Sequence, residues 1–110
     1  MPSNVLSAAV TAAASGDNEL VAAVTGKRIR VVSFFLVGTG TVVAKFKSGG
    51  STDLTGNLPC VASTVLSSGF AGRRLSGGFE HHFQTAAGQA LNLNLSTNVA
   101  LTGWLNYVLD

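Results

Sequence analysis

The residues best suited to metal or acid–base chemistry stand together as Glu80-His81-His82. Histidine changes charge near neutral pH and is a common metal ligand. Adjacent side chains of a strand point to opposite faces, so His81 and His82 cannot chelate one ion from within a single strand. A threefold axis could gather one histidine from each subunit into a metal-binding or pH-sensitive cluster, and the alternative is a pair of exposed or hydrogen-bonded histidines. For the single chain we predict no metal site.

Two glycine-containing stretches invite a nucleotide-binding interpretation, and both fail it. Gly26-Lys27 has Val21 where a phosphate loop begins with glycine, and Arg28 where serine or threonine binds magnesium. Gly38-Thr39-Gly40 lacks the third glycine and the following helix of a dinucleotide site, so it predicts a hairpin turn. We expect no nucleotide cofactor.

Serine and threonine supply many hydroxyl groups, but the available bases are two histidines and five acids. No Gly-x-Ser-x-Gly elbow is present, and the serines cluster in predicted turns, where local hydrogen bonding explains them. The sequence therefore predicts a protein that is not an enzyme, with no catalytic residues and no cofactor.

Composition points to an assembly. The chain has 110 residues, the size of one domain, and only 11% are charged, against about 25% in a typical soluble protein. Its mean hydropathy is +0.39. No run of 18 apolar residues predicts a membrane helix, and a net charge of +2 is too sparse for a nucleic-acid surface. We therefore expect no membrane and no nucleic-acid partner, and a homo-oligomer that hides apolar surface.

Two further features bear on the compartment. Cys60 is the one cysteine of the chain, so no intrachain disulfide can form, and we expect it to act as a small buried or half-buried apolar residue. The N-terminal residues lack a basic stretch followed by a long apolar core, so we expect no secretion signal.

The stretch 26–37 is the strand around which the chain is organised. Arg28 and Arg30 first alternate with apolar residues, as in a half-buried strand, and the residues that follow are apolar on both faces. Either a second layer of the same chain or another subunit must cover the second face, and the composition favours another subunit. The predicted subunit interface is Val32, Phe34, Leu36 and Trp104. For Trp104 the alternative is a role as core filler.

The remaining sequence predicts short strands separated by turns. We expect a hairpin from 5–14 and 19–24, and a strand over 41–48. If that strand pairs with 26–37, Lys45 and Lys47 join the arginines in a basic patch. Further predicted strands are 52–58, 79–85, 91–95 and 99–109.

Seven or eight short strands without a helix predict an all-β fold, an antiparallel β-sandwich of jelly-roll type. We expect residues 1–4 to form an N-terminal arm and residues 5–110 a single domain. The long loop 60–78 carries Arg73 and Arg74, and with His81 and His82 it is the predicted partner-binding loop. The alternative is a solvated loop tip.

Three stretches carry a resemblance to small β-sandwich virion proteins of tailed phages. They are 15–31 (Ser-Gly-Asp-Asn-Glu-Leu-Val to Ile-Arg-Val), Phe79 with 84–95 (Gln-Thr-Ala-Ala-Gly-Gln-Ala-Leu-Asn-Leu-Asn-Leu), and 99–107. The chain departs from the shared pattern at 60–78 and at Glu80-His81-His82.

The resemblance implies a structural role on the virion. The expected function is that of a capsid cement or decoration protein, made in the host cytoplasm and located on the capsid surface. It would act as a homotrimer at threefold positions, where it binds the major capsid protein and stabilises the coat lattice. The alternative is a head- or tail-fibre module that binds a receptor or glycan.

Overall fold

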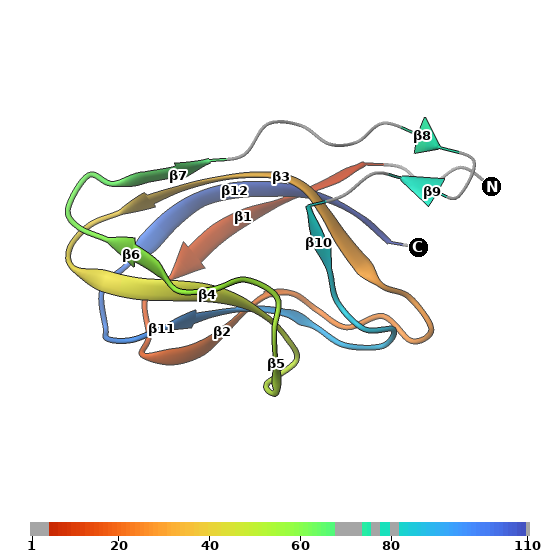
Figure 1. Ribbon diagram of the computed structural model, residues 1–110, viewed down its shortest axis with the longest axis horizontal. Helices are drawn as coiled ribbons and strands as arrows, with labels where there is room; N and C mark the ends of the chain where they lie inside the picture. The colour runs from red at the N-terminus through yellow and green to blue at the C-terminus, as the bar shows by residue number, and fades with distance from the viewer. Residues whose placement is uncertain (1–4, 68–73, 76–77, 80–81, 110) are drawn as a thin grey trace.

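The computed structural model describes residues 5–67, 74–75, 78–79 and 82–109, which fold into two packed antiparallel sheets (Figure 1). Sheet A runs in the order β1 (Leu6–Ala12), β12 (Leu101–Leu109), β3 (Ile29–Gly38), with β10 (Phe83–Gln84) and β7 (Val65–Ser67) both on the far side of β3. Sheet B runs β2 (Gly16–Val21), β11 (Leu91–Leu95), β4 (Val42–Ser48), with β5 (Thr52–Asp53) and β6 (Leu58–Cys60) beyond it. A separate pair is formed by β8 (Arg74–Leu75) and β9 (Gly78–Phe79).

The predicted all-β sandwich of jelly-roll type is confirmed. The strands β1 and β2, β3 and β4, and β11 and β12 follow one another in the chain but lie in opposite sheets. The described strands outnumber the seven or eight expected. The surplus consists of two- and three-residue strands, some at the sheet edges and two in the separate β8–β9 pair, which are too short for a periodic pattern to reveal.

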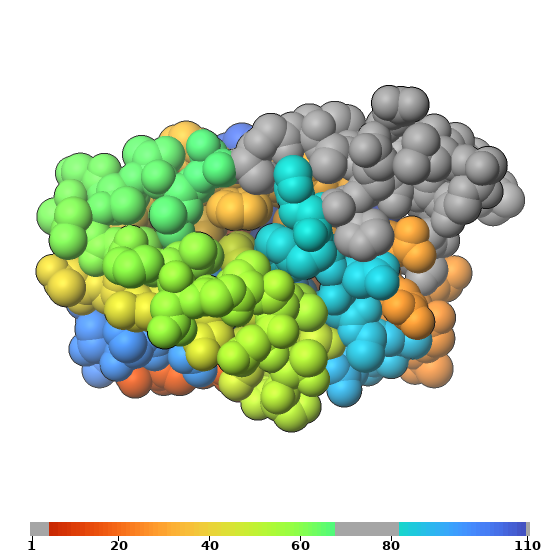
Figure 2. Space-filling model, viewed as in Figure 1, coloured from red at the N-terminus to blue at the C-terminus, as the bar shows by residue number. Residues whose placement is uncertain are grey.

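Two predicted hairpins are wrong for the same reason. The strands β1 and β2 were expected to pair, as were β3 and β4, but each pair is split between the two sheets. Each connection crosses the edge of the sandwich instead of turning within one sheet. In the view of Figure 2, the segment from β5 to β7 and the segment around β10 lie on the near side of the molecule.

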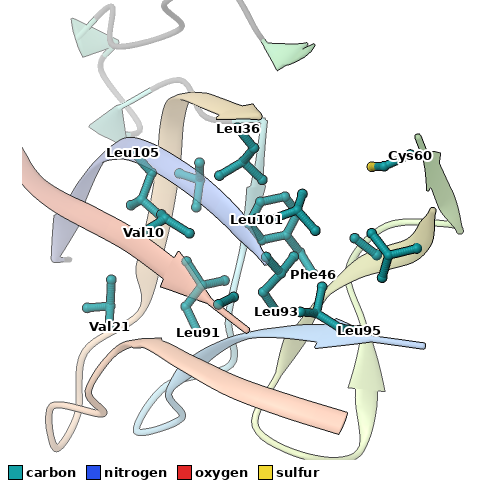
Figure 3. Packing of buried hydrophobic residues seen from close by; sticks show 14 of the residues in the cluster. Val10, Val21, Leu36, Phe46, Cys60, Leu91, Leu93, Leu95, Leu101 and Leu105 are labelled. Atoms are coloured by element: carbon teal, nitrogen blue, oxygen red, sulfur yellow. The ribbon is translucent and has the colours of Figure 1, made fainter. Parts of the chain in front are cut away.

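The core lies between the sheets and follows from period-two alternation. Leu91, Leu93 and Leu95 of β11 are buried, whereas the asparagines between them are partly exposed (Figure 3). At the centre, Phe46 of sheet B packs against Phe34 and Phe83 of sheet A, with ring centroids 5.2 and 4.8 Å away. These rings and the buried aliphatic side chains around them remove apolar surface from water and so hold the two layers together.

The segment after β10 ties the two sheets together by hydrogen bonds. Thr85, which is buried, accepts a bond at Oγ1 from the Ile29 amide at 3.0 Å. Farther along, Ser48 Oγ donates to Gln89 Oε1 at 2.6 Å and accepts from the Ala86 amide at 2.9 Å. Because these polar groups are hydrogen-bonded to one another, the cost of removing them from water is offset, and the bonds fix the crossing between the sheets.

Gly103 lets β12 lie close to β3. Its φ is +155°, and a Cβ at this position would overlap the carbonyl oxygen of Phe35 and lie 2.9 Å from its carbonyl carbon. The obstacle is backbone, which cannot move aside without disturbing the ladder. Only glycine fits here, directly before Trp104.

We therefore expect Gly103→Ala to lower the free energy of unfolding by about 2 to 4 kcal/mol, since the added methyl must separate two central strands. Urea unfolding followed by circular dichroism measures this. Gly56→Ala is the matched control, because nothing lies within 4 Å of its Cβ position. Equal stability of the two variants would contradict the close approach.

Candidate interaction surface

Within the described part of the chain, no pocket is found, and no three His, Cys, Asp or Glu side chains gather into a group that could hold a metal ion. No helix of the described residues is long and apolar enough to cross a membrane. The outer faces and edges of the two sheets, which differ in charge and in exposed apolar area, are therefore the candidates for a functional surface.

The strand register of sheet A aligns its outward side chains in rows. The rows, which we call the outer face of sheet A, are Ser7, Asn106 and Ser33; Ala9, Trp104, Phe35 and Ser67; and Thr11, Thr102, Val37 and Val65. Ser33 is buried, so the accessible part of the face lies mainly in the second and third rows. None of these side chains carries a charge. The next row along β3 contains Arg30, so the uncharged area ends there.

Aromatic rings dominate the centre of this face. Trp104 and Phe35 stack with their centroids 6.0 Å apart and their planes 12° from parallel. Trp104 is 45% exposed and Val65 is 52% exposed, so both leave substantial apolar surface in water. Tryptophan at the centre of an uncharged area is typical of protein interfaces.

A short polar network borders the aromatic row. Ser7 Oγ donates to Asn106 Oδ1 at 2.7 Å, and Asn106 Nδ2 donates to Ser33 Oγ at 2.9 Å. These bonds join β1, β12 and β3 through their side chains as well as their backbones. These side chains are therefore fixed in one arrangement before any partner binds, which lowers the entropic cost of binding.

The outer face of sheet B has the opposite character. Lys45 Nζ forms an ion pair with Asp53 Oδ2 at 3.2 Å, and Asn94 Nδ2 donates to Asp17 Oδ1 at 2.8 Å. Glu19 is exposed on the same sheet. This face is suited to remain hydrated. The contrast between the two sheets singles out sheet A as the candidate interaction surface.

The basic patch expected from pairing of 26–37 with 41–48 does not form. Lys45 and Lys47 lie on β4 in sheet B, whereas Arg30 lies on β3 in sheet A. Lys45 pairs with Asp53, and Lys47 Nζ donates to the Gly50 carbonyl at 3.1 Å.

Three of the predicted interface residues lie within the fold. Leu36 belongs to the core and Phe34 packs against it, because sheet B of the same chain covers this side of β3. Val32 is also fully buried, at a bulge where Val31 and Ser33 pair with consecutive residues of β12 and Val32 pairs with none. For Phe34 and Leu36, the cover that was expected from another subunit is supplied by the second sheet. Neither Val32 nor Leu36 has exposed surface in the single chain.

Trp104, the fourth predicted interface residue, lies on the outer face of sheet A, and its part in a subunit contact stays a prediction. Its neighbour Phe35 was not singled out from the sequence. The sequence indicates in part that Phe35 faces outward, because it lies between Phe34 and Leu36, which face the core. The bulge at Val32 could not be read from the sequence, and it determines which side of β3 each residue takes.

The predicted partner-binding loop is described only in part. Arg73 and His81 lie outside the described residues, and for Arg74 the structure gives the backbone of β8 alone. His82 is exposed, and its amide donates to the Val31 carbonyl at 2.8 Å. The role of this loop stays a prediction.

Cys60 is buried, as expected, at the edge of the core on β6 (Figure 3). Its thiol donates a weak bond to the Leu58 carbonyl, with sulfur and oxygen 3.5 Å apart. Burial raises the pKa of the thiol above its usual range, because an apolar setting disfavours the thiolate.

No family model matches the chain, and no curated protein matches it. Among solved structures, one matching chain belongs to a study described as "Bacillus endospore appendages form a novel family of disulfide-linked pili". The two chains are 18% identical and superpose with a TM-score of 0.45, over 99% of this chain and 88% of that chain.

We expect the Cys60 thiol to resist alkylation in the folded protein at pH 8 and to react at least about tenfold faster once urea unfolds the chain, since folding both shields the thiol and raises its pKa. The unfolded chain loses the thiol proton at lower pH than the folded one. Stability should therefore fall as pH rises above about 8.5. A Cys60→Ala variant should lack that component, and identical pH profiles would contradict it.

Proposed function

We propose that this chain is a non-enzymatic structural protein of a phage virion, which decorates the capsid by docking the outer face of sheet A on the major capsid protein. The virion assignment is supported by the resemblance carried by 15–31, 79 with 84–95, and 99–107. The observation that carries the docking role is the uncharged face around the stacked rings of Trp104 and Phe35, on a sandwich whose other face is charged.

The proposed mechanism is burial of apolar area on a rigid platform. Trp104 is the expected anchor, since its exposed ring can fill a depression in the coat while the stacked ring of Phe35 on the adjacent strand restricts its orientation. The serine and threonine hydroxyls around it can bond to polar groups of the partner without bringing in buried charge. Sheet B, with Lys45, Asp53 and Glu19, would then face water and keep the decorated particle soluble.

Copies bound at equivalent lattice positions would each bridge neighbouring coat subunits. Individual contacts need only be weak, because the lattice repeats them and separation of two coat subunits must break all contacts of the bridging copy. The location would be the capsid surface, after synthesis in the host cytoplasm.

The alternative is a head- or tail-fibre module that binds a receptor or glycan. The exposed ring of Trp104 favours it to the extent that a flat aromatic surface also suits packing against an apolar ligand face. The two roles differ in copy number, since a decoration protein follows the lattice and a fibre module occurs in a few copies.

We expect Trp104→Ala to weaken binding to capsids that lack the protein by about 30-fold or more, corresponding to about 2 kcal/mol for a central anchor. Co-sedimentation with capsids at a series of protein concentrations measures this, and thermal unfolding verifies that the variant is folded. Glu19→Ala is the matched control, an exposed change on sheet B that should leave binding unaltered.

Saturation should occur at a stoichiometry set by lattice symmetry. Equal binding by the two variants would remove the docking role of sheet A. No binding to capsids, together with inhibition of infection by the free protein, would favour the fibre alternative.

A further inference from the structure

The edge strand β1 lacks the features that normally keep sheet edges apart. Exposed edges are usually shortened, charged, bulged or interrupted by proline, because their free amide and carbonyl groups can pair with another strand. The sequence of β1 is Leu-Ser-Ala-Ala-Val-Thr-Ala, seven residues with no charge and no proline. Its pairing with β12 runs without a register shift, so the strand contains no bulge.

The other edges of the described sheets all carry such protection. In sheet B, β2 presents Asp17 and Glu19 and has a bulge opposite β11. On the far side of sheet B, β5 has two residues, and β6 has three with Pro59 among them. The far side of sheet A is divided between β7, with three residues, and β10, with two. Among the edge strands of the two described sheets, β1 alone has none of these protective features, so it is the edge best able to pair with another strand.

The sequence of β1 is complementary to itself. If two copies pair antiparallel about a twofold axis at Ala9, Ser7 lies opposite Thr11 of the second copy, so hydroxyl meets hydroxyl on the outer face. On the inner face Leu6 meets Ala12, and Ala8 meets Val10. The small Ala9 meets its own symmetry mate at the axis. Each position thus finds a partner of its own kind, as an isologous contact requires.

Surface that is exposed in the single chain would be covered by this pairing. Leu6 is 39% exposed although it lies on the same face of β1 as Val10, which is in the core, and Ala8, which packs against the core. A second β1 strand would extend the inner face past Leu6 and place Ala12 of the second copy beside it. No charged side chain of β1 would be buried, because the strand has none.

We propose that β1 pairs with β1 of a second copy of this chain, which joins the two A sheets into one continuous sheet across a twofold axis. The two outer faces then lie on the same side, and their Trp104 rings are separated by three strand spacings, about 14 Å. An isologous contact closes after two copies. The trimer expected from the resemblance would therefore need a different contact.

The pairing also supplies the area that docking would need. The outer face of sheet A spans four strands and about five residues along each, or about 300 to 400 Å². A standard interface buries about 800 Å² on each partner. Two joined faces approach that size, whereas one does not. The proposal itself depends only on β1 and holds whether or not the partner is a capsid.

The test begins with the mass of the isolated chain by light scattering at 10 to 100 µM, where we expect twice the 11.2 kDa of the single chain. Ala9→Lys should give the single-chain mass, since two lysines would face each other at the axis. Thr102→Lys is the matched control, equally exposed on the outer face but one strand in from the edge, and it should remain a dimer. A wild-type monomer at 100 µM would overturn the proposal.

Cysteine cross-linking then tests the register, in a Cys60→Ala background. Ala9→Cys should form a disulfide-linked dimer under mild oxidation, because paired residues across antiparallel strands have Cα atoms about 4.5 to 5.5 Å apart. Thr11→Cys alone should not, since its symmetry mate would lie about 14 Å along the strand. Combining Ser7→Cys with Thr11→Cys should restore the cross-link.

The outcomes separate this proposal from the proposed function. A dimer that survives Ala9→Lys but is lost in Trp104→Ala would mean that the outer faces meet each other, which overturns β1 pairing. Cross-linking at Ala9 without any capsid binding would leave β1 pairing supported and the decoration role refuted.

Discussion

The packing of Phe46 between Phe34 and Phe83 is the contact on which the rest of the structure depends. It is the point where β4 of sheet B meets β3 and β10 of sheet A, and it turns the inner side of β3 into core. Because Phe34 and Leu36 face the core, the alternation of side chains along β3 places Phe35 on the outer face, beside Trp104. The apolar residues of this strand that prompted the expectation of a subunit cover are thus divided between the interior of the chain and one small external face. The low proportion of charged residues, 11%, thus reflects both the apolar core and the uncharged outer face of sheet A.

The two outer faces differ because their strands differ in the residues placed between core positions. In β4 and β2 these are lysines and acids, whereas in β1, β12 and the second half of β3 they are small, hydroxylated or aromatic. Solubility can therefore be provided by one sheet while the other remains free of charge. The edge strand β1 continues the uncharged character up to the rim of sheet A. The uncharged outer face and the uncharged edge strand therefore adjoin each other on sheet A.

The sequence predicted the fold class and the long strands well, because these depend on local alternation. The strands expected at 91–95 and 99–109 are present as β11, with leucines alternating with asparagines, and β12, whose core residues alternate with Thr102 and Trp104. Pairing was predicted poorly, since it is set by contacts between distant segments. Nothing local shows that β1 lies beside β12, or that Val32 sits at a bulge. Of the candidate surface, only Trp104 could be predicted from the sequence. Phe35 lies on the outer face because the bulge at Val32 reverses the alternation along β3, and a bulge cannot be read from the sequence.

Because β1 pairs with β12, the first and last long strands of the chain must both be synthesised before sheet A can form. Leu6 pairs with Tyr107, so a growing chain cannot complete sheet A until its residues beyond 100 have left the ribosome. A copy that is truncated before β12 lacks Trp104 and also the strand that holds β1 against β3. Such a fragment presents neither the aromatic platform nor an ordered rim. Any contact made through the outer face of sheet A therefore requires that β12 has been synthesised and has paired with both of its neighbours.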